Sequence, residues 1–261
     1  MEFEDILYEK RDGVAKISIN RPKVYNAFRI KTLAEISDAL TDADENYPSI
    51  GVVVLTGVGD KSFCTGGDAG EKGAAHVYPR GMIMMHARAI DLIRKIQQPV
   101  IAAVNGYALG GGHVLQTVCD LTIASETAVF GQTGPRSGSF DAGYGAGYIA
   151  RLVGEKKARE IWYLCQKYSA QEALGMGLVN KVVPADKLEE EVADWCKVIM
   201  DKSPTAIRCL KASFNAQAGS CMGNALLGDE MAWGFWNSEE AFEGRNAFDG
   251  RRTADFSKFR K

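Results

Sequence analysis

The sequence lacks any apolar stretch that approaches the about 20 consecutive residues needed to span a membrane. Its N-terminal residues, MEFEDILYEKRDG, are acidic and mixed, and they lack the apolar segment that is typical of a secretory signal peptide. We therefore expect a cytoplasmic protein with no membrane partner.

An excess of charge of one sign is also lacking. The chain has 31 Lys and Arg against 33 Asp and Glu, which gives a net charge of -2. Nucleic acids and anionic membranes bind surfaces with a positive excess, so neither is expected as a partner. A small-molecule substrate is favoured.

Paired cysteines and metal-ligand spacings are absent as well. The six cysteines form no CxxC pair, which predicts free thiols in a reducing compartment. The histidines, at positions 76, 86 and 113, have neither the spacing nor the cysteine neighbours of a metal site. No metal is therefore expected.

What is present is enough apolar sequence for a sizeable core: 46% of the 261 residues are hydrophobic and 25% are charged. Apolar or alternating runs predict strands over 14–19, 52–55, 100–104, 121–124 and 178–183. Helical periodicity between them predicts helices over 31–44, 81–96, 155–164 and 188–200. Strands that alternate with helices predict an α/β fold with mainly parallel pairing.

The strand signals stop after Pro204. Three helices are expected in this tail, over 205–215, 223–235 and 238–247. Because the tail is too short to form a core alone, it should pack on the body or on another subunit. We therefore divide the chain into a core, 1–203, and a C-terminal helical region, 204–261, with a loop beside the site over 69–80.

Two glycine clusters each follow a predicted buried strand, at 64–68 (CTGGD) and at 106–113 (GYALGGGH). Glycine lets a ligand approach backbone N–H groups closely, and the second cluster also opens a helix with unpaired N-terminal amides. Together the clusters could stabilise an oxyanion, although each alone could be only a tight turn between a strand and a helix. Neither matches the two common glycine-rich nucleotide-binding motifs.

Four motifs carry a resemblance to a known family. They are INRPKVYNAF (19–28), FCTGGD (63–68), NGYALGGG (105–112) and CDLTIA (119–124), and their order and spacing resemble those of the crotonase superfamily. The resemblance implies a spiral of ββα units, a homotrimer or dimer of trimers, and a CoA thioester substrate with no cofactor beyond its CoA moiety. It also implies that Gly67 and Gly111 donate the oxyanion-hole N–H groups. The positions that it implies for CoA and acyl binding are Tyr25, Ala27, Thr65, Gly66, Asp68, Ala69, Tyr107, Leu109, Gly110, Thr133 and Arg251.

Fold alone cannot choose the reaction, because this superfamily runs several chemistries on one scaffold. Its hydratases hold water between two glutamates, one shortly after the Gly-Gly-Gly run and one after the Phe-Gly-Gln strand. This chain has Val114 and Gly134 at those positions. Hydratase activity is therefore not expected.

The segment GQTGPRSGSFDAGYG (131–145) resembles the naphthoate synthase subgroup, which closes a ring by a Claisen reaction. The match continues through 154–162 and 243–248. By this resemblance Ser139, Asp141 and Tyr78 fall on polar catalytic positions. Structural interpretations remain open: Ser139 or Asp141 could cap a helix, and Tyr78 could be an exposed loop aromatic.

Departures from that subgroup change the expected reaction. Tyr25, Ala69, Gly70 and Trp236 stand where the subgroup has charged or hydrogen-bonding groups, which predicts a pocket for a neutral alicyclic acyl group. The pattern resembles that of hydrolases that open 2-ketocyclohexanecarboxyl-CoA to pimelyl-CoA in anaerobic benzoate degradation. Asp141 would then be the base for water. The alternatives are a ring-closing 1,4-dihydroxy-2-naphthoyl-CoA synthase and a non-catalytic binding protein with the crotonase fold.

Overall fold

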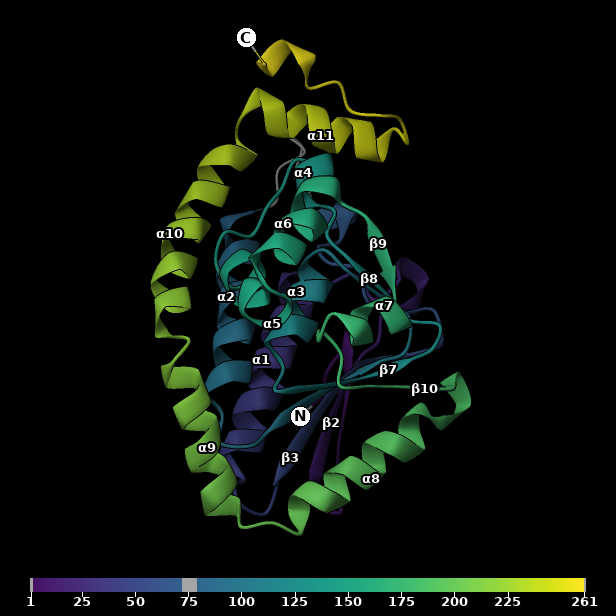
Figure 1. Ribbon diagram of the computed structural model, residues 1–261, viewed down its shortest axis with the longest axis vertical. Coiled ribbons are helices and arrows are strands. Elements are labelled where there is room, and N and C mark those ends of the chain that lie inside the picture. Colours follow the sequence, from purple (N-terminus) through teal and green to yellow (C-terminus); the bar gives the residue numbers. More distant parts are fainter. Residues whose placement is uncertain (1, 72–78, 261) are drawn as a thin grey trace.

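The computed structural model describes residues 2–71 and 79–260 and has two sheets surrounded by helices (Figure 1). The first sheet has six strands in the order β1-β2-β3-β5-β7-β10. They span β1 Ile6–Arg11, β2 Val14–Ile19, β3 Val52–Gly57, β5 Val100–Val104, β7 Leu121–Ser125 and β10 Lys181–Val183. β1 pairs antiparallel with β2, and every other pair in this sheet is parallel.

The second sheet is built from strands of three residues each, in the order β4-β6-β8-β9. They are β4 Ser62–Cys64, β6 Tyr107–Leu109, β8 Val129–Gly131 and β9 Lys167–Ser169. Each of the consecutive pairs β3–β4, β5–β6 and β7–β8 places one strand in each sheet and is followed by a helix. This repeated ββα order confirms the α/β fold class predicted from the sequence.

Eleven α-helices lie in the described residues. They are α1 Ile30–Glu45, α2 Arg80–Lys95, α3 Gly111–Val118, α4 Gly134–Ser137, α5 Ile149–Val153, α6 Glu155–Leu164, α7 Ala170–Gly175, α8 Leu188–Met200, α9 Pro204–Ala216, α10 Gly219–Trp236 and α11 Glu239–Asp249. A π-helical turn, Tyr144–Tyr148, and short 3₁₀ turns at 22–24, 69–71, 185–187 and 257–259 complete the secondary structure. No described helix is both long and apolar enough to cross a membrane.

The central strands are apolar on both faces because helices cover both. Val53 and Leu55 of β3 belong to the larger core, together with α1 and α2. Val52 and Val54 point the other way, into a smaller core with Leu188 and neighbouring residues of α8. An unbroken apolar run is the pattern expected for a strand buried on both sides.

One predicted strand is wrong in extent: the segment 178–183 is a strand only over β10. Gly177 has φ +80°, and the N–H of Leu178 donates to the carbonyl of Ala173, so the chain is still in a turn there. Asn180 then accepts the N–H of Thr122 on its side chain. The turn is formed by apolar residues, which explains why the sequence pattern predicted a strand there.

The C-terminal tail packs on the body, with α9 and α10 along one side and α11 across one end near α4 (Figure 1). Lys211 holds α9 in place, because its buried ammonium donates to the carbonyls of Ile93 and Gln98 and pairs with Asp120 at 2.8 Å. The division at residue 203 stays a prediction.

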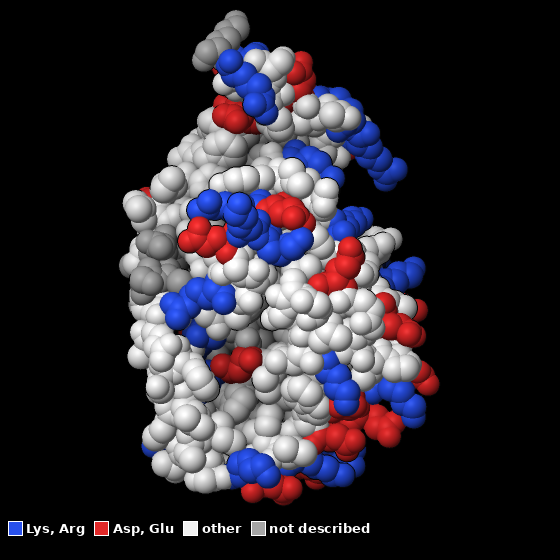
Figure 2. Space-filling view, viewed as in Figure 1, with Lys and Arg blue, Asp and Glu red and all other residues white. Residues whose placement is uncertain are grey.

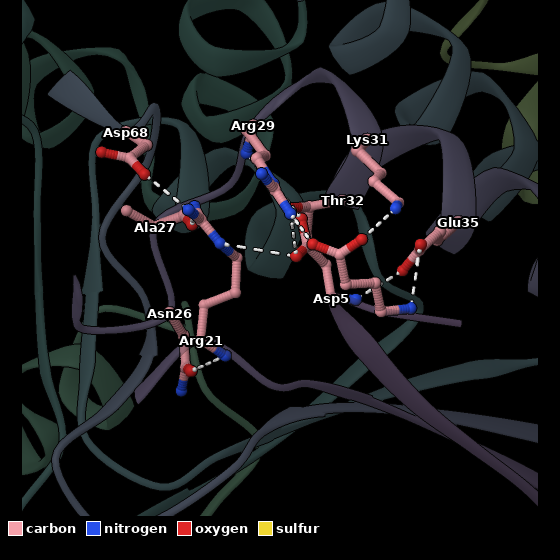
Figure 3. A network of polar contacts seen from close by, with 10 residues as sticks. Asp5, Arg21, Asn26, Ala27, Arg29, Lys31, Thr32, Glu35 and Asp68 are labelled. Atoms are coloured by element: carbon pink, nitrogen blue, oxygen red, sulfur yellow. Dashed lines mark hydrogen bonds and ion pairs between the residues drawn. The ribbon is translucent and has the colours of Figure 1, made fainter. Parts of the chain in front are cut away.

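A network of ion pairs joins the N-terminal segment, α1 and the first glycine cluster (Figure 3). Asp5 receives Nε and Nη2 of Arg29 at 2.7 and 2.8 Å and the hydroxyl of Thr32 at 2.6 Å. Arg21 approaches the same carboxylate at 3.7 Å and pairs with Asp68 at 2.7 Å. The turn that carries Gly66 and Gly67 is therefore tied to α1 through charged side chains.

On the face shown in Figure 2, Lys and Arg side chains are interspersed with Asp and Glu, in keeping with the net charge of -2. The cysteines at 64, 119, 165, 196 and 209 are free thiols, and all but Cys209 are buried. Within the described residues, no group of three or more His, Cys, Asp or Glu side chains is arranged to hold a metal ion.

Candidate active site

The two glycine clusters meet backbone to backbone. A Cβ on Gly66 would lie 3.0 Å from the nitrogen of Gly111, and a Cβ on Gly112 would lie 2.1 Å from the carbonyl oxygen of Cys64. Gly66 also has φ +92°, a conformation that glycine adopts without strain. Close approach of the two turns therefore requires glycine, and it places Gly67 and Gly111 at one cavity.

Gly67 owes its orientation to a short bridge with Phe28. The N–H of Phe28 donates to Gly66 and the N–H of Asp68 donates to Phe28, both at 2.8 Å. In a parallel bridge the central residue turns its own N–H away from the partner strand. The N–H of Gly67 therefore points away from Phe28.

Gly111 is the first residue of α3, so its N–H belongs to the first turn, whose amides have no partner within the helix. Its carbonyl accepts a hydrogen bond from Nε2 of His86 at 3.2 Å, and since a carbonyl only accepts, this nitrogen carries the hydrogen. The His86 ring stacks on Phe28 at 5.0 Å, and burial lowers its pKa. The His86 imidazole therefore contacts both Phe28 and the backbone of Gly111.

The cavity brings most of the predicted catalytic groups together. Its lining includes Thr65, Gly66, Gly67, Gly110, Gly111, Thr133, Ser139 and Asp141 from the body. The tail contributes Gly228, Asp229, Ala232, Trp236, Arg245 and Phe248. Tyr78 was predicted to contact the substrate, but it lies outside the described residues.

Asp141 accepts hydrogen bonds from the local backbone and also lines the cavity. Its Oδ1 accepts the N–H groups of Gly143 and Gly145, each at 2.9 Å, at the start of the π-helical turn. A Cβ on Gly145 would lie 2.7 Å from Cγ of Asp141, so this glycine makes room for the carboxylate. Asp141 is therefore not the N-cap of this turn, which is Gly143, although its Oδ1 stabilises the turn. Oδ2 receives no hydrogen bond from the described residues.

Ser139 follows α4 and does not cap a helix with its side chain. Its N–H donates to the carbonyl of Gly134 at 2.8 Å, and its Oγ accepts Nε1 of Trp236 at 3.2 Å. Because the indole can only donate, the hydroxyl hydrogen of Ser139 can be given to another acceptor. Trp236 thus orients a hydroxyl donor toward the cavity.

The lining has two charged side chains that the sequence analysis did not place at the site. Asp229 on α10 is a second carboxylate in the lining, and burial, the charge of Asp141 and then that of Glu230 raise its pKa to about 6. Arg245 on α11 also lines the cavity, where its Nη2 donates to the carbonyl of Trp236 at 2.6 Å. The sequence pattern could not show this, because both residues come from the tail and face the site only after it has folded onto the body.

The other predicted binding positions lie beside the cavity rather than in its lining. The rings of Tyr25 and Tyr107 meet edge-on at 6.3 Å, and Thr65 donates to the carbonyl of Tyr25 at 3.2 Å. Asp68, Ala69 and Leu109 belong to the glycine turns or adjoin them in sequence, and Ala27 precedes Phe28, which bridges to Gly67. Arg251 lies apart: it is exposed, beyond the end of α11, and is not among the lining residues.

The two positions at which hydratases of the predicted superfamily carry glutamate both line the cavity, as Val114 and Gly134. A Cβ on Gly134 would lie 2.6 Å from the carbonyl oxygen of Ser139. Without a rearrangement of this turn, no side chain fits there. The carboxylates of the cavity, Asp141 and Asp229, therefore come from other elements.

Comparison with known proteins agrees with this geometry. The family model described as enoyl-CoA hydratase/isomerase matches residues 9–259. The chain belongs to this family. The crotonase superfamily, with its CoA thioester chemistry, was therefore predicted correctly from the sequence motifs.

Solved structures of the enoyl-CoA hydratase/isomerase family resemble this chain over nearly its full length. An enoyl-CoA hydratase from Mycobacterium avium subsp. paratuberculosis K-10 is 29% identical, with a TM-score of 0.87 over 98% of this chain and 100% of the other. A carnitinyl-CoA hydratase from Mycobacterium avium is 31% identical, with a TM-score of 0.86 over 97% and 98% of the two chains. An enoyl-CoA hydratase from Bacillus anthracis is 32% identical, with a TM-score of 0.77 over 97% and 99%.

Sequence reasoning missed three side chains of this family member's cavity: Arg245, His86 and Asp229. His86 was considered only as a metal ligand, and its place on α2 beneath Gly111 depends on how α2 packs against α3. Asp229 stands in a Gly-Asp-Glu segment that resembles a solvated helix face. The one available signal was Gly228, since a glycine inside a helix suggests close packing against another backbone.

Proposed function

We propose that this chain is an acyl-CoA hydrolase that opens the ring of 2-ketocyclohexanecarboxyl-CoA by adding water, with pimelyl-CoA as product. The observation that carries the proposal is the Asp141 carboxylate at a cavity shared with Gly67 and Gly111, while Val114 and Gly134 leave both hydratase positions without a carboxylate. A β-ketoacyl thioester matches this arrangement, because its cleavage needs a base for water and donors for an enolate.

In the proposed reaction, Asp141 takes one proton from water as the water oxygen bonds to the ring ketone carbon. The bond between that carbon and the α-carbon then breaks, and its electron pair forms the thioester enolate. The N–H groups of Gly67 and Gly111 hold the enolate oxygen. The former ketone becomes a carboxylic acid, and the α-carbon takes up a proton to complete pimelyl-CoA.

Ser139 would donate its hydroxyl hydrogen to the ketone oxygen, whose negative charge grows as water adds. Trp236 supports this role, because its indole N–H donates to the Ser139 oxygen and leaves the hydroxyl hydrogen for another acceptor. We also propose a contact of Tyr78 with the ketone or its hydrate, and a homotrimer or dimer of trimers as the assembly.

The runner-up is the ring-closing naphthoate synthase, whose substrate carries an additional aromatic carboxylate. Arg245 in the lining is the observation that favours it. Asp229 opposes it, because this carboxylate in the lining, when ionised, repels the additional carboxylate of the substrate and raises the cost of burying it. The balance of charge favours a neutral acyl group.

Mass spectrometry of separate incubations with three thioesters tests the proposal. We expect 2-ketocyclohexanecarboxyl-CoA to gain one water, and succinylbenzoyl-CoA to remain unchanged. Crotonyl-CoA should also remain unchanged, which distinguishes ring opening from hydration. Loss of one water from succinylbenzoyl-CoA at a comparable rate, or rapid hydration of crotonyl-CoA, would sink the hydrolase assignment.

A further inference from the structure

Asp229 lines the cavity, but the proposed ring opening does not use its carboxylate. It lies on α10, the long helix that runs along the outside of the body (Figure 1). The residue before it, Gly228, is buried against the loop that carries Asp141. A Cβ on Gly228 would lie 3.0 Å from both Cβ of Ala142 and the nitrogen of Gly143. This close backbone approach brings Asp229 next to the Asp141 loop.

The surroundings of Asp229 favour its protonated form more than those of an ordinary surface carboxyl group. Burial is the first cause of its raised pKa, and the charges of Asp141 and Glu230 add to it. Glu230 is paired with Arg80 of α2, and Arg245 of α11 donates to the carbonyl of Trp236. Burial lowers the pKa of His86 on α2. A carboxyl group with a raised pKa, that of Asp229, therefore shares the cavity with the carboxylate of Asp141.

The proposed ring opening needs such a pair. One group must remove a proton from the water that attacks the ketone carbon. Another group must supply a proton to the α-carbon, which is bonded to the ketone carbon until the ring opens. Paired carboxyl groups whose surroundings separate their proton affinities are a common solution to this demand. A single carboxylate would have to carry its proton from the first carbon to the second.

We propose that Asp229 is a second catalytic residue, the general acid that delivers a proton to the α-carbon of the thioester enolate. In this step the O–H bond of Asp229 breaks, a C–H bond forms at the α-carbon, and the enolate electron pair becomes the C–H bond. Asp141 holds the proton taken from water, and its transfer to Asp229 restores both groups once the product has left. This inference rests on the proposed function, because it assumes a thioester enolate in the cavity.

Exchange of the α-hydrogens of pimelyl-CoA in D₂O isolates this step. The exchange is the reverse of enolate protonation, and it involves no water addition to a ketone. We expect the parent protein to catalyse it and Asp229→Asn to slow it by roughly 100-fold. Asp186→Asn, which changes an exposed carboxylate on a 3₁₀ turn, is the matched control and should behave as the parent does.

Ring opening is measured on the same variants. Failure of the proposed function can then be distinguished from failure of the role proposed for Asp229. A parent that exchanges α-hydrogens without opening the ring would reject the proposed function and keep the role of Asp229. Normal exchange by a folded Asp229→Asn variant would overturn the role of Asp229, as would a parent that opens the ring without any exchange. Asp229→Glu keeps the carboxyl group and should recover part of the exchange, which a loss caused by misfolding would not predict.

Discussion

At the scale of single residues, Asp141 uses its two oxygens differently. Oδ1 accepts the two glycine N–H groups that shape the loop, and Oδ2 is available for water. Replacement by Asn preserves an acceptor at the Oδ1 position and removes the ability to take a proton. The substitution therefore separates the structural task of this residue from the chemical one.

We expect Asp141→Asn to lower the turnover of ring opening by roughly 100-fold or more, as the loss of a positioned base does. CoA affinity and the thermal midpoint should change little because the loop keeps its hydrogen bonds. Steady-state kinetics together with thermal unfolding measures both quantities. A turnover within a few-fold of the parent would remove Asp141 from the mechanism.

Gly111 provides the second residue-scale prediction. An added Cβ would lie 2.7 Å from Cζ of the buried Phe28 ring, so Gly111→Ala must shift either that ring or the first turn of α3. The loss of one oxyanion donor costs about 3 kcal/mol in the transition state, so kcat should fall by more than 100-fold with a smaller effect on KM.

Gly175→Ala is the control for this change, because nothing lies within 4 Å of the added Cβ. Its kcat should match that of the parent. If Gly111→Ala kept full kcat in a folded protein, the second oxyanion donor would have to lie elsewhere.

Residues of the glycine turns could be predicted from the sequence because their chemistry is local. Gly66, Gly67, Gly110 and Gly111 are contiguous within their motifs, and the turn itself requires glycine. Asp229 could not be predicted, since the neighbouring Gly228 suggests close packing but does not show which carboxylate of the tail faces the cavity and which faces water. Only the packing of α10 on the Asp141 loop makes that distinction.

At the scale of elements, α10 contains a natural pair of test positions. Gly228 is pressed against Ala142, whereas nothing lies within 4 Å of a Cβ added at Gly234 on the same helix. The helix propensity of alanine over glycine is worth about 0.5–1 kcal/mol at either position. The two sites therefore differ only in what the methyl group meets.

We expect Gly234→Ala to raise the free energy of unfolding by about 0.5–1 kcal/mol and to leave kcat unchanged. Gly228→Ala should gain no stability and should lower kcat by roughly tenfold, because it moves Asp229 and the Asp141 loop apart. Chemical denaturation and initial rates on both variants check this. Equal effects of the two substitutions would show that α10 does not position the site.

Short elements were the hardest to predict. β4, β6, β8 and β9 have three residues each, too few to show a period, although they carry the turns of the site. The long helices α1, α2, α6 and α8 lie close to their predicted ranges, because an amphipathic face repeated over several turns is unambiguous. Length is not the whole reason, because β1, which has six residues like β2, was not predicted either.

At the scale of the whole molecule, Asp5 links the N-terminal segment to α1 and, through Arg21, to the turn of Gly66. Burial alone would raise its pKa, but the hydrogen bonds from Arg29 and Thr32 outweigh burial and hold the pKa below the ordinary value of 3.8. A carboxylate with a lowered pKa in the folded state stabilises the protein above its unfolded pKa. That stability is lost as the pH falls below about 4, where the unfolded chain binds the proton first.

Asp5→Asn should therefore lower the free energy of unfolding by about 2 kcal/mol at pH 7, because it leaves Arg29 without its buried partner. Between about pH 5 and pH 3 the variant should lose less stability than the parent. Urea unfolding across this range measures both, with Asp186→Asn as the exposed control. Parallel pH profiles of parent and variant would contradict the linkage.

The contribution of the tail helices to the cavity matters for the evolution and the engineering of this protein. The oxyanion glycines and Asp141 lie before residue 203, whereas Asp229, Trp236 and Arg245 of the cavity lining lie after it. A recombination near residue 203 between relatives would therefore exchange one wall of the pocket as a single inherited block and keep the glycine N–H groups that hold the enolate oxygen. New acyl preferences could arise in this way without any change in the glycine turns.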